Sequence, residues 1–245
     1  MNNFVKLFRK ILKNIKIKKR DNIICSADLS IFLTDNQKIL KIIIDEILYK
    51  IGNEGSLIMP NYYLGPTNKI IREKYYFMSP LYRFFKENYD VNCSKSILHS
   101  HVGIGPKTKF LNKTKKNLSF GINSDFYEME KNNFKQLLIG CNANTGFTYA
   151  HHLEKIFSVP YRQNKKIMLK IIRNKKVVRV IYNYYVRTSQ KYKENFDFIL
   201  DKVKKKNIYK LKFGKITYFK LKNFKLIAQK EYKKNNFILV NYESD

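Results

Sequence analysis

Tryptophan is absent from the 245-residue sequence, and glycine and proline are scarce, at 9 and 5 residues. Acidic residues are few as well: 19 Asp and Glu accompany 49 Lys and Arg, which gives a formal net charge of +30. Most of the basic residues are lysines spread along the chain among Ile, Asn, Tyr and Phe. We interpret this as compositional drift, because no zinc-finger, helix-turn-helix or RNP-type motif accompanies the charge. No specific nucleic-acid partner is therefore expected.

The sequence contains only three cysteines, Cys25, Cys93 and Cys141, and they are far apart. An odd, dispersed set provides neither a disulfide framework nor a CxxC metal pair, so we expect a reducing compartment and no metal cofactor. No apolar run approaches the roughly 20 residues of a membrane-spanning helix, and residues 1–20 lack the uninterrupted apolar core of a signal peptide. These absences predict a cytoplasmic protein.

Residues 4–19 predict a basic amphipathic helix, which we separate, as residues 1–20, from the rest of the chain. Its apolar residues form one stripe, composed of Phe4, Phe8, Ile11, Leu12 and Ile15. Such a helix can lie on the anionic inner surface of a membrane. It can equally pack this stripe on the domain that follows, and the sequence leaves both interpretations open.

Strand and helix signals alternate through residues 21–245, which predicts a single layered α/β domain. Apolar runs predict buried strands at residues 22–25, 56–59 and 134–141. Periodicity and capping residues predict helices at residues 37–51, 81–88, 125–131 and 149–157. Towards the C-terminus we expect a hairpin over 166–172 and 177–186, a helix over 193–206, two strands within 209–219 and a helix over 224–233. Pro60 and Pro160 are expected to end the second strand and the fourth helix.

The most informative stretch is Cys141–Arg162, which follows a buried strand through the polar turn at residues 142–146. On the helix that opens near Thr148, the side chains of Thr148, His151 and Glu154 are three residues apart and share one face. This spacing brings an imidazole beside a carboxylate at the carboxyl end of a strand, where open α/β sheets place their chemistry. His152 is only two residues from Glu154 and points to another face, so His151 is the candidate. The alternative is that both histidines are packing residues.

Several stretches occur in the order of the motifs of one family. They are GSLIMP at 55–60, SPLYRFFKENYD at 79–90, HSHVGIGPKT at 99–108, FGINSDF at 120–126, LLIGCNANT at 137–145, TYAHHLE at 148–154 and VPYR at 159–162. The set resembles the antibiotic N-acetyltransferase family, whose best-known members acetylate the 3-amino group of aminoglycosides. The resemblance covers roughly residues 22–162, and it implies an α/β/α fold with a central mixed sheet, like that of the aminoglycoside 3-N-acetyltransferases.

The chain departs from the family's motifs in two segments, which identifies it as a divergent member. Of the family's R-S-x-H-P-x-H-S, only Ser94, His99 and Ser100 remain, and Asp125 replaces the proline of F-G-x-x-S-P. Residues 100–105, SHVGIG, approach the pyrophosphate loop of a different acetyltransferase fold, but a serine replaces the Arg or Gln of that loop, and we reject the assignment. The tail around Arg187 resembles members associated with bacterial surface-glycan genes.

The resemblance implies how the catalytic residues act. His151 would be the general base that frees the lone pair of the acceptor amine, and Glu154 would orient its ring. Thr148, or the backbone amides near Asn144 and Thr145, would serve the thioester oxygen. No cysteine is placed as a nucleophile, so we expect direct transfer without an acyl-enzyme.

The resemblance also implies the binding residues. The donor would be acetyl-CoA, bound along Ser26, Ser30, Ser100, Asn144 and Thr145. His99 and Tyr62 are the candidate substrate contacts.

Three functions follow from these observations. The first is an acetyl-CoA-dependent N-acetyltransferase that acts on an amino sugar, a small-molecule precursor of a surface glycan. The second is an aminoglycoside 3-N-acetyltransferase that confers antibiotic resistance; the net charge of +30 weighs against it, since aminoglycosides are polycations. The third is a basic protein without catalysis that binds nucleic acid or a membrane surface.

Overall fold

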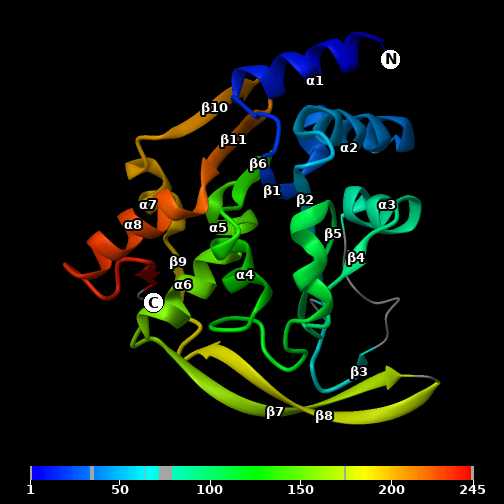
Figure 1. The fold of residues 1–245 in the computed structure, drawn as a ribbon. Helices are drawn as coiled ribbons and strands as arrows, with labels where there is room; N and C mark the ends of the chain where they lie inside the picture. Colours follow the sequence, from blue (N-terminus) through cyan, green and yellow to red (C-terminus); the bar gives the residue numbers. More distant parts are fainter. Residues whose placement is uncertain (1, 34–35, 64, 72–78, 174, 244–245) are drawn as a thin grey trace.

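The computed structural model describes residues 2–33, 36–63, 65–71, 79–173 and 175–243, and a mixed β-sheet runs through its centre (Figure 1). The sheet has seven strands among these residues, in the order β10-β11-β6-β1-β2-β5-β4. Their bounds are β1 Asn22–Ala27, β2 Ser56–Tyr62, β4 Asn92–Cys93, β5 His99–Ile104, β6 Lys135–Ile139, β10 Lys206–Leu211 and β11 Gly214–Lys220. The central strands β6, β1 and β2 are parallel, and the outer strands pair antiparallel.

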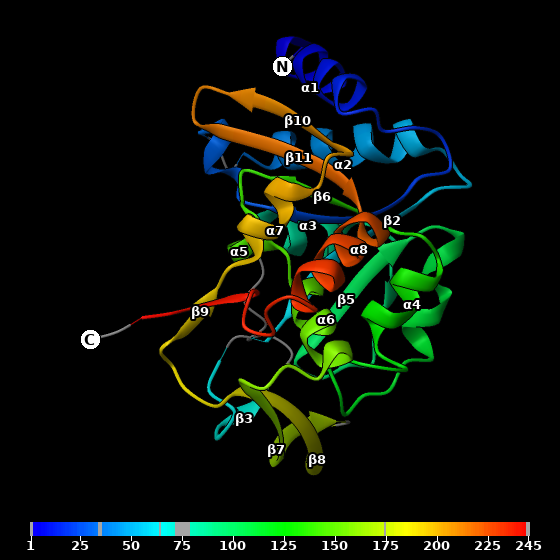
Figure 2. The same cartoon turned by 90° about the vertical axis from the view of Figure 1, so that its left-hand side faces the viewer.

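Helices cover both faces of the sheet (Figures 1 and 2). One face packs against α1 Asn2–Asn14, α2 Gln37–Ile51 and α3 Pro80–Asn88. The other face packs against α4 Asp125–Lys131, α5 Ala143–Gly146, α6 Tyr149–Phe157, α7 Phe196–Lys202 and α8 Leu221–Tyr232. Each face of the sheet has its own hydrophobic core, and successive residues of β1 alternate between the two. Ile23 and Cys25 lie in the core shared with α1, α2 and α3, and Ile24 lies in the core on the opposite face. The predicted layered α/β/α fold with a central mixed sheet is confirmed.

Smaller elements lie at the margins of this sheet. The long hairpin of β7 Arg162–Arg173 and β8 Lys176–Arg187 joins β3 Ile70–Ile71 in a second sheet, which crosses one end of the molecule in Figure 1. A third, two-stranded sheet pairs β9 Tyr192–Glu194 with β12 Val240–Tyr242. Two short 3₁₀ segments, η1 Leu29–Phe32 and η3 Pro106–Asn112, follow β1 and β5.

The N-terminal helix uses its apolar stripe inside the protein. Phe8 and Ile11 have no exposed surface, and α1 packs on α2. The stripe is therefore covered, and the membrane-surface interpretation of residues 1–20 has no structural support. Among the described residues, no helix is both long and apolar enough to cross a membrane. The helix also ends five residues before the predicted position 19, because Lys16 adopts a left-handed φ of 61° and the amide of Ile17 bonds back to the Leu12 carbonyl at 3.1 Å.

Pro60 does not end the second strand, which was predicted to stop at residue 59; β2 continues to Tyr62. The strand β1 pairs with β2 only as far as Ile58, so the missing amide of Pro60 leaves no gap in that ladder. The extension carries Tyr62 to the carboxyl edge of the sheet, opposite His99 of β5.

The helix predicted over 193–206 is wrong. Residues 192–194 form β9, paired with β12, and α7 occupies only Phe196–Lys202. A residue remote in sequence caps the start of α7. The side-chain oxygen of Asn144 accepts hydrogen bonds from the amides of Phe196, at 2.7 Å, and Asp197, at 3.1 Å. Likewise, the polar turn at 142–146 contains the one-turn helix α5, and α6 ends at Phe157, where Ser158 turns left-handed before Pro160 is reached.

A close approach at the carboxyl edge of the sheet depends on Gly140, which follows β6. Gly140 has a φ of 74°, and a Cβ at this position would collide with the carbonyl oxygen of Asp28, in the loop after β1. The amide of Asp28 in turn donates to the Ile139 carbonyl at 2.7 Å. Glycine thus allows the loops that follow β1 and β6 to touch.

We expect Gly140→Ala to destabilise the protein more than Gly52→Ala, by at least about 1 kcal/mol. Both glycines have positive φ, so each alanine incurs the left-handed penalty of about 1–2 kcal/mol. Only Gly140 also has a backbone atom in the way, whereas a Cβ on Gly52 meets nothing within 4 Å. Urea unfolding of the two variants measures the difference, and equal losses would contradict the close approach.

Candidate active site

His151 and Glu154 of α6 lie side by side, as their spacing in the sequence predicts. His151 Nδ1 lies 2.7 Å from Glu154 Oε2, one helical turn away. The Glu154 side chain is fully buried, and the His151 side chain retains 20% of its exposure. The ring is therefore held at Nδ1 by a buried carboxylate, and part of the side chain remains exposed.

Arg162, the first residue of β7, is the second partner of the Glu154 carboxylate. Its Nε lies 2.8 Å from Glu154 Oε2, and its side chain is 8% exposed. Burial opposes ionisation of Glu154, but the His151 ring, its hydrogen bond and the Arg162 charge outweigh burial and hold the pKa of this carboxyl below its usual value. Arg162 Nη2 also approaches His151 Nδ1, to 3.0 Å, yet the ionised carboxylate keeps the ring proton on Nδ1.

His151 is consequently a neutral base with a free Nε2. Burial lowers the pKa of His151, Glu154 opposes this, and the charges of Arg162 and Arg187 add to the lowering, so that the net shift is downward. The rings of Phe120 and Phe196 lie edge-on to the imidazole, at 5.9 and 5.1 Å between centroids. At neutral pH the side chain can accept a proton through Nε2.

A second carboxylate faces this free nitrogen. Glu194 Oε1, from β9, lies 3.8 Å from His151 Nε2, and Glu194 is also paired with Arg187 of β8. A cationic amine placed between Nε2 and Glu194 would meet both a base and a negative charge. The sequence analysis missed Glu194 because it lies in the region predicted as a helix.

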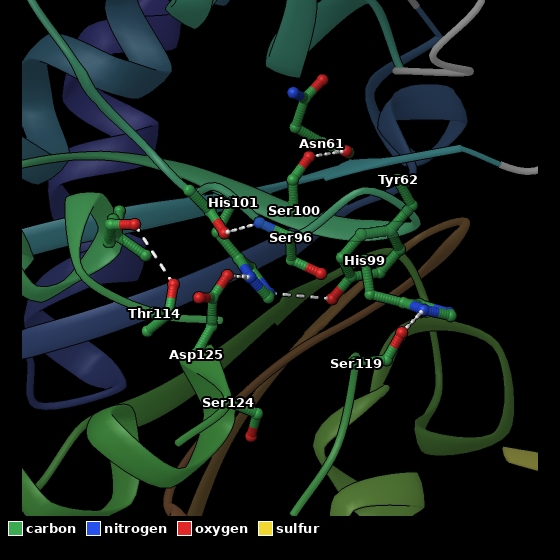
Figure 3. Close-up of polar contacts among 12 residues, drawn as sticks. Asn61, Tyr62, Ser96, His99, Ser100, His101, Thr114, Ser119, Ser124 and Asp125 are labelled. Atoms are coloured by element: carbon green, nitrogen blue, oxygen red, sulfur yellow. Dashed lines mark hydrogen bonds and ion pairs between the residues drawn. The ribbon is translucent and has the colours of Figure 1, made fainter. Parts of the chain in front are cut away.

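The strands β2 and β5 contribute a second group of polar side chains (Figure 3). The Tyr62 hydroxyl lies 3.0 Å from His101 Nε2, and His101 Nδ1 lies 2.7 Å from Asp125 Oδ2. His99 Nδ1 contacts Ser119 Oγ at 2.5 Å, and its ring packs edge-on against Tyr62 with centroids 5.1 Å apart. Burial, followed by the neighbouring His151, lowers the pKa of His99 to about 3, so this ring is neutral. The sequence signal for His101 was its position two residues after His99, on the same face of a strand.

The serines predicted to follow the donor have different surroundings. Ser26 is buried, and its hydroxyl accepts from Gln136 Nε2 at 3.1 Å. The buried Ser100 hydroxyl donates to the carbonyl oxygen of Asn61. Ser30 is exposed and lines a cavity of about 620 Å³ at the carboxyl end of β1, together with Ser79 and Pro80 at the start of α3. Of the three, only Ser30 faces open space.

Asn144 and Thr145 both take part in helix capping in this structure. Asn144 caps α7, and the amide and hydroxyl of Thr145 both donate to Asn142 Oδ1, at 3.0 and 2.9 Å. The amides of Ala143 and Asn144 point to the Asp197 carboxylate, at 2.9 and 3.5 Å. These amides are thus engaged away from His151, which leaves Thr148 as the predicted thioester contact on the histidine's own helix face.

The remaining candidates fill structural positions. His152 is fully buried, and its Nδ1 accepts the amide of Gly121 at 3.1 Å. Burial raises the pKa of the Cys141 thiol to about 12, so it is protonated at neutral pH and a poor nucleophile. Within the described part of the chain, no cluster of three or more His, Cys, Asp or Glu residues could hold a metal ion.

Comparisons with known proteins bear on the family and the fold of the chain. A family model described as aminoglycoside 3-N-acetyltransferase matches residues 78–231, more than half of the chain. The crystal structure of YokD from Bacillus subtilis superposes with a TM-score of 0.77 at 16% identity, covering 95% of this chain and 94% of that one. The aminoglycoside acetyltransferase AAC(3)-IIb gives 0.78 at 12% identity, covering 94% and 97%.

AAC-IIIb, in a binary structure with CoASH, superposes with a TM-score of 0.75 at 13% identity and covers 98% of both chains. No curated protein matches the sequence. At these identities, the likeness to solved structures shows the fold alone.

We expect Glu154→Gln and Arg187→Gln to shift the pKa of His151 in opposite directions. Glu154→Gln removes a negative charge that favours the imidazolium and so lowers the pKa further, whereas Arg187→Gln removes an opposing positive charge and raises it. NMR titration of the four histidines measures both shifts. The buried His152, whose pKa burial lowers to about 4, serves as the internal control, and shifts of the same sign at His151 would contradict the assignment.

Proposed function

The chain belongs to the aminoglycoside 3-N-acetyltransferase family, and on that premise we propose that it transfers an acetyl group from acetyl-CoA to the amine of an amino sugar, a precursor of a surface glycan. One observation carries the proposal: His151 has its Nδ1 held by a buried carboxylate and its Nε2 open and facing a second carboxylate. This arrangement suits a base that takes a proton from an amine.

The carboxyl edge of the sheet offers room for the donor. Bound acetyl-CoA supplies an electrophilic thioester carbonyl. The cavity of about 620 Å³ beside Ser30 opens at the carboxyl end of β1, where α/β sheets bind their ligands. The structure of AAC-IIIb with CoASH, on the same fold, supports a CoA donor.

The residues of α6 divide the chemical work. A sugar ammonium must lose a proton before its lone pair can attack, and neutral His151 accepts that proton at Nε2. Glu154 fixes the ring orientation and stabilises the imidazolium that forms. We infer that Thr148, on the same helix face, donates to the oxygen that gains charge.

The local charge favours an acceptor with few amines. The carboxylates described near His151 are Glu154 and Glu194, and each is paired with an arginine, Arg162 or Arg187. A polycationic aminoglycoside gains little from such a compensated site, whereas a single ammonium needs only Glu194. Membership of the family keeps the aminoglycoside reaction as the alternative acceptor assignment.

A polyanion-binding function is the second candidate, favoured by a groove at the opposite edge of the sheet. The groove has a volume of about 770 Å³ and includes the start of β6, and its lysines are Lys16, Lys18, Lys135, Lys204, Lys205, Lys206 and Lys220. Binding of a single-stranded oligonucleotide here would weaken steeply with salt and would be indifferent to changes at His151. Fluorescence anisotropy at two salt concentrations, on the wild type and Lys204→Ala, tests this candidate.

We expect His151→Ala to lower kcat by about 10²–10⁴-fold, because general-base catalysis is lost. Binding of acetyl-CoA should stay near the wild-type value, whereas the thermal unfolding midpoint should fall, because the buried Glu154 carboxylate loses one of its two partners. Release of the CoA thiol measures turnover. Glu231→Gln, which removes a carboxylate bound to Lys202 and Lys234 outside the site, is the matched control and should be fully active. More than a tenth of wild-type turnover in His151→Ala would rule out His151 as the base.

We expect Arg187→Gln to improve polycationic acceptors selectively. The change leaves Glu194 without its compensating charge, so kcat/KM for an aminoglycoside such as gentamicin should rise by up to about 10-fold, with a smaller gain for a mono-amino sugar. Arg179→Gln removes the same charge from an exposed position on β8 and should change neither value. Equal effects of the two variants would mean that overall charge, rather than Glu194, governs the acceptor.

A further inference from the structure

One face of the β7–β8 hairpin leaves large apolar side chains in solvent. Their exposed fractions are 53% for Met168, 42% for Ile172, 53% for Val177 and 56% for Ile181. In the antiparallel register, Met168 lies directly opposite Ile181. Nearer the turn, Ile172 lies opposite Val177 in the same way. Single exposed apolar residues are ordinary at a protein surface, but two cross-strand pairs on one face of a ribbon form a patch.

The other face of the hairpin is held by the protein. Leu169 and Tyr182 have no exposed surface, and they pack in a small core with Ile71 of β3. Successive side chains of a strand point to opposite faces, so the burial of Leu169 directs its neighbours Met168 and Lys170 outwards. Figures 1 and 2 both place the hairpin at one end of the molecule, where an extended surface can reach it.

Basic side chains separate the two apolar pairs. Lys170 lies opposite Arg179, and both side chains are exposed. Like charges directly opposite each other destabilise a sheet, and neither side chain has an ion-pair partner in the part of the chain that the structure describes. Residues 162–187 contain nine Lys and Arg and no Asp or Glu. An anionic partner would relieve this repulsion. Lys170, Arg179 and the four apolar residues are called the outer face below.

The exposed side chains distinguish between anionic partners. A second copy of the chain would bring an equally basic ribbon against the first. Proteins that bind single-stranded nucleic acid stack bases on aromatic side chains, whereas none of the four exposed apolar side chains here is aromatic. Apolar side chains interleaved with Lys and Arg suit the boundary of an anionic bilayer, because the apolar groups enter the acyl region while the basic groups reach the lipid phosphates.

The hairpin also connects this face to the candidate active site. Arg162, the first residue of β7, holds Glu154, and Arg187, the last residue of β8, is paired with Glu194. Met168 lies further along β7, at roughly 20 Å of extended strand from Arg162. A hairpin docked on lipid would therefore hold the site close to the membrane surface.

We propose that the outer face of the β7–β8 hairpin docks on an anionic lipid bilayer. The apolar pairs enter the interface at the level of the headgroups, and Lys170 and Arg179 bind lipid phosphates. Docking requires no step of the acetyl transfer, so it extends the proposed function and is measured without turnover. The membrane contact lies on the hairpin and not on α1, whose apolar stripe is buried against the domain.

The absence of tryptophan from the chain allows a single fluorescent reporter of docking. In Ile181→Trp, the emission maximum should shift to shorter wavelength on addition of vesicles of phosphatidylglycerol and phosphatidylcholine at about 1:2, because the indole enters the interface. Vesicles of phosphatidylcholine alone should give no shift. The matched control is Ile208→Trp on β10, 44% exposed and at the other end of the molecule in Figure 1, which should not respond.

Sedimentation with the same vesicles measures what the charges of the outer face contribute. Each basic residue near an anionic surface strengthens binding about fivefold, so Lys170→Gln combined with Arg179→Gln should weaken binding by about 25-fold. The matched control is Lys210→Gln combined with Lys215→Gln, a cross-strand pair of β10 and β11. Because these charges are remote from the docked surface, the control should lose less than about threefold.

The apolar contribution is tested without a change of charge. Met168→Thr combined with Ile181→Thr should weaken vesicle binding at least about 10-fold, because less apolar surface then leaves water. Both side chains are exposed, so the unfolding midpoint should stay at the wild-type value. Non-specific attraction of a chain with net charge +30 predicts instead no effect of this pair and equal losses from the two charge pairs. Either result would overturn the proposal.

Three further outcomes would also overturn it. A shift in Ile181→Trp that grows with protein concentration in the absence of vesicles would show that two copies meet through this face. A shift on addition of a single-stranded oligonucleotide, with none on vesicles, would identify a nucleic acid as the partner. A shift in Ile208→Trp with none in Ile181→Trp would place lipid binding at the opposite end of the molecule.

Discussion

The buried carboxylate of Glu154 is the contact on which the site depends. It is fully buried on α6, yet it is held at once by His151 of the same helix and by Arg162 at the start of β7. An isolated carboxylate in this position would be strongly destabilising, so helix, loop and strand must meet for the charge to be tolerated. The same contact orients the imidazole and ties the outer hairpin to α6. The cluster of His151, Glu154 and Arg162 therefore contributes both to the packing of α6 and to the orientation of the candidate base.

The architecture explains why this cluster lies at an open edge. The parallel strands β6, β1 and β2 all end on the same side of the sheet. The segments that follow β6 and β1 carry α6 and the cavity beside Ser30, and Tyr62 is the last residue of β2. Gly140 allows two of these loops to touch. The lysine-lined groove lies at the other edge of the sheet. The candidate site around His151 and this lysine-lined groove therefore lie at opposite edges of the sheet.

Local signals in the sequence were enough to predict part of this structure. The helices at 37–51, 125–131 and 149–157 have the predicted bounds, because periodicity and caps such as Asn36 and Ser124 act within a few residues. The resemblance to a family supplied the layered fold. Features that depend on distant partners were missed: α7 is capped by Asn144, about 50 residues away, and the pairing of His101 with Asp125 joins two elements 24 residues apart. The serines Ser26 and Ser100 could not be assigned from sequence, since their hydroxyls are used by Gln136 and Asn61.

The central claim is that this chain is an enzyme built to bind an acetyl-CoA donor rather than a general binder of anions. Isothermal titration of the wild-type protein with acetyl-CoA at low and high salt tests that claim without knowledge of the acceptor. We predict saturable one-to-one binding that persists at high salt, because a shaped site contributes more than charge. Heat that disappears as salt is raised, or no binding at all, would contradict the account and would favour the lysine-lined groove as the functional surface.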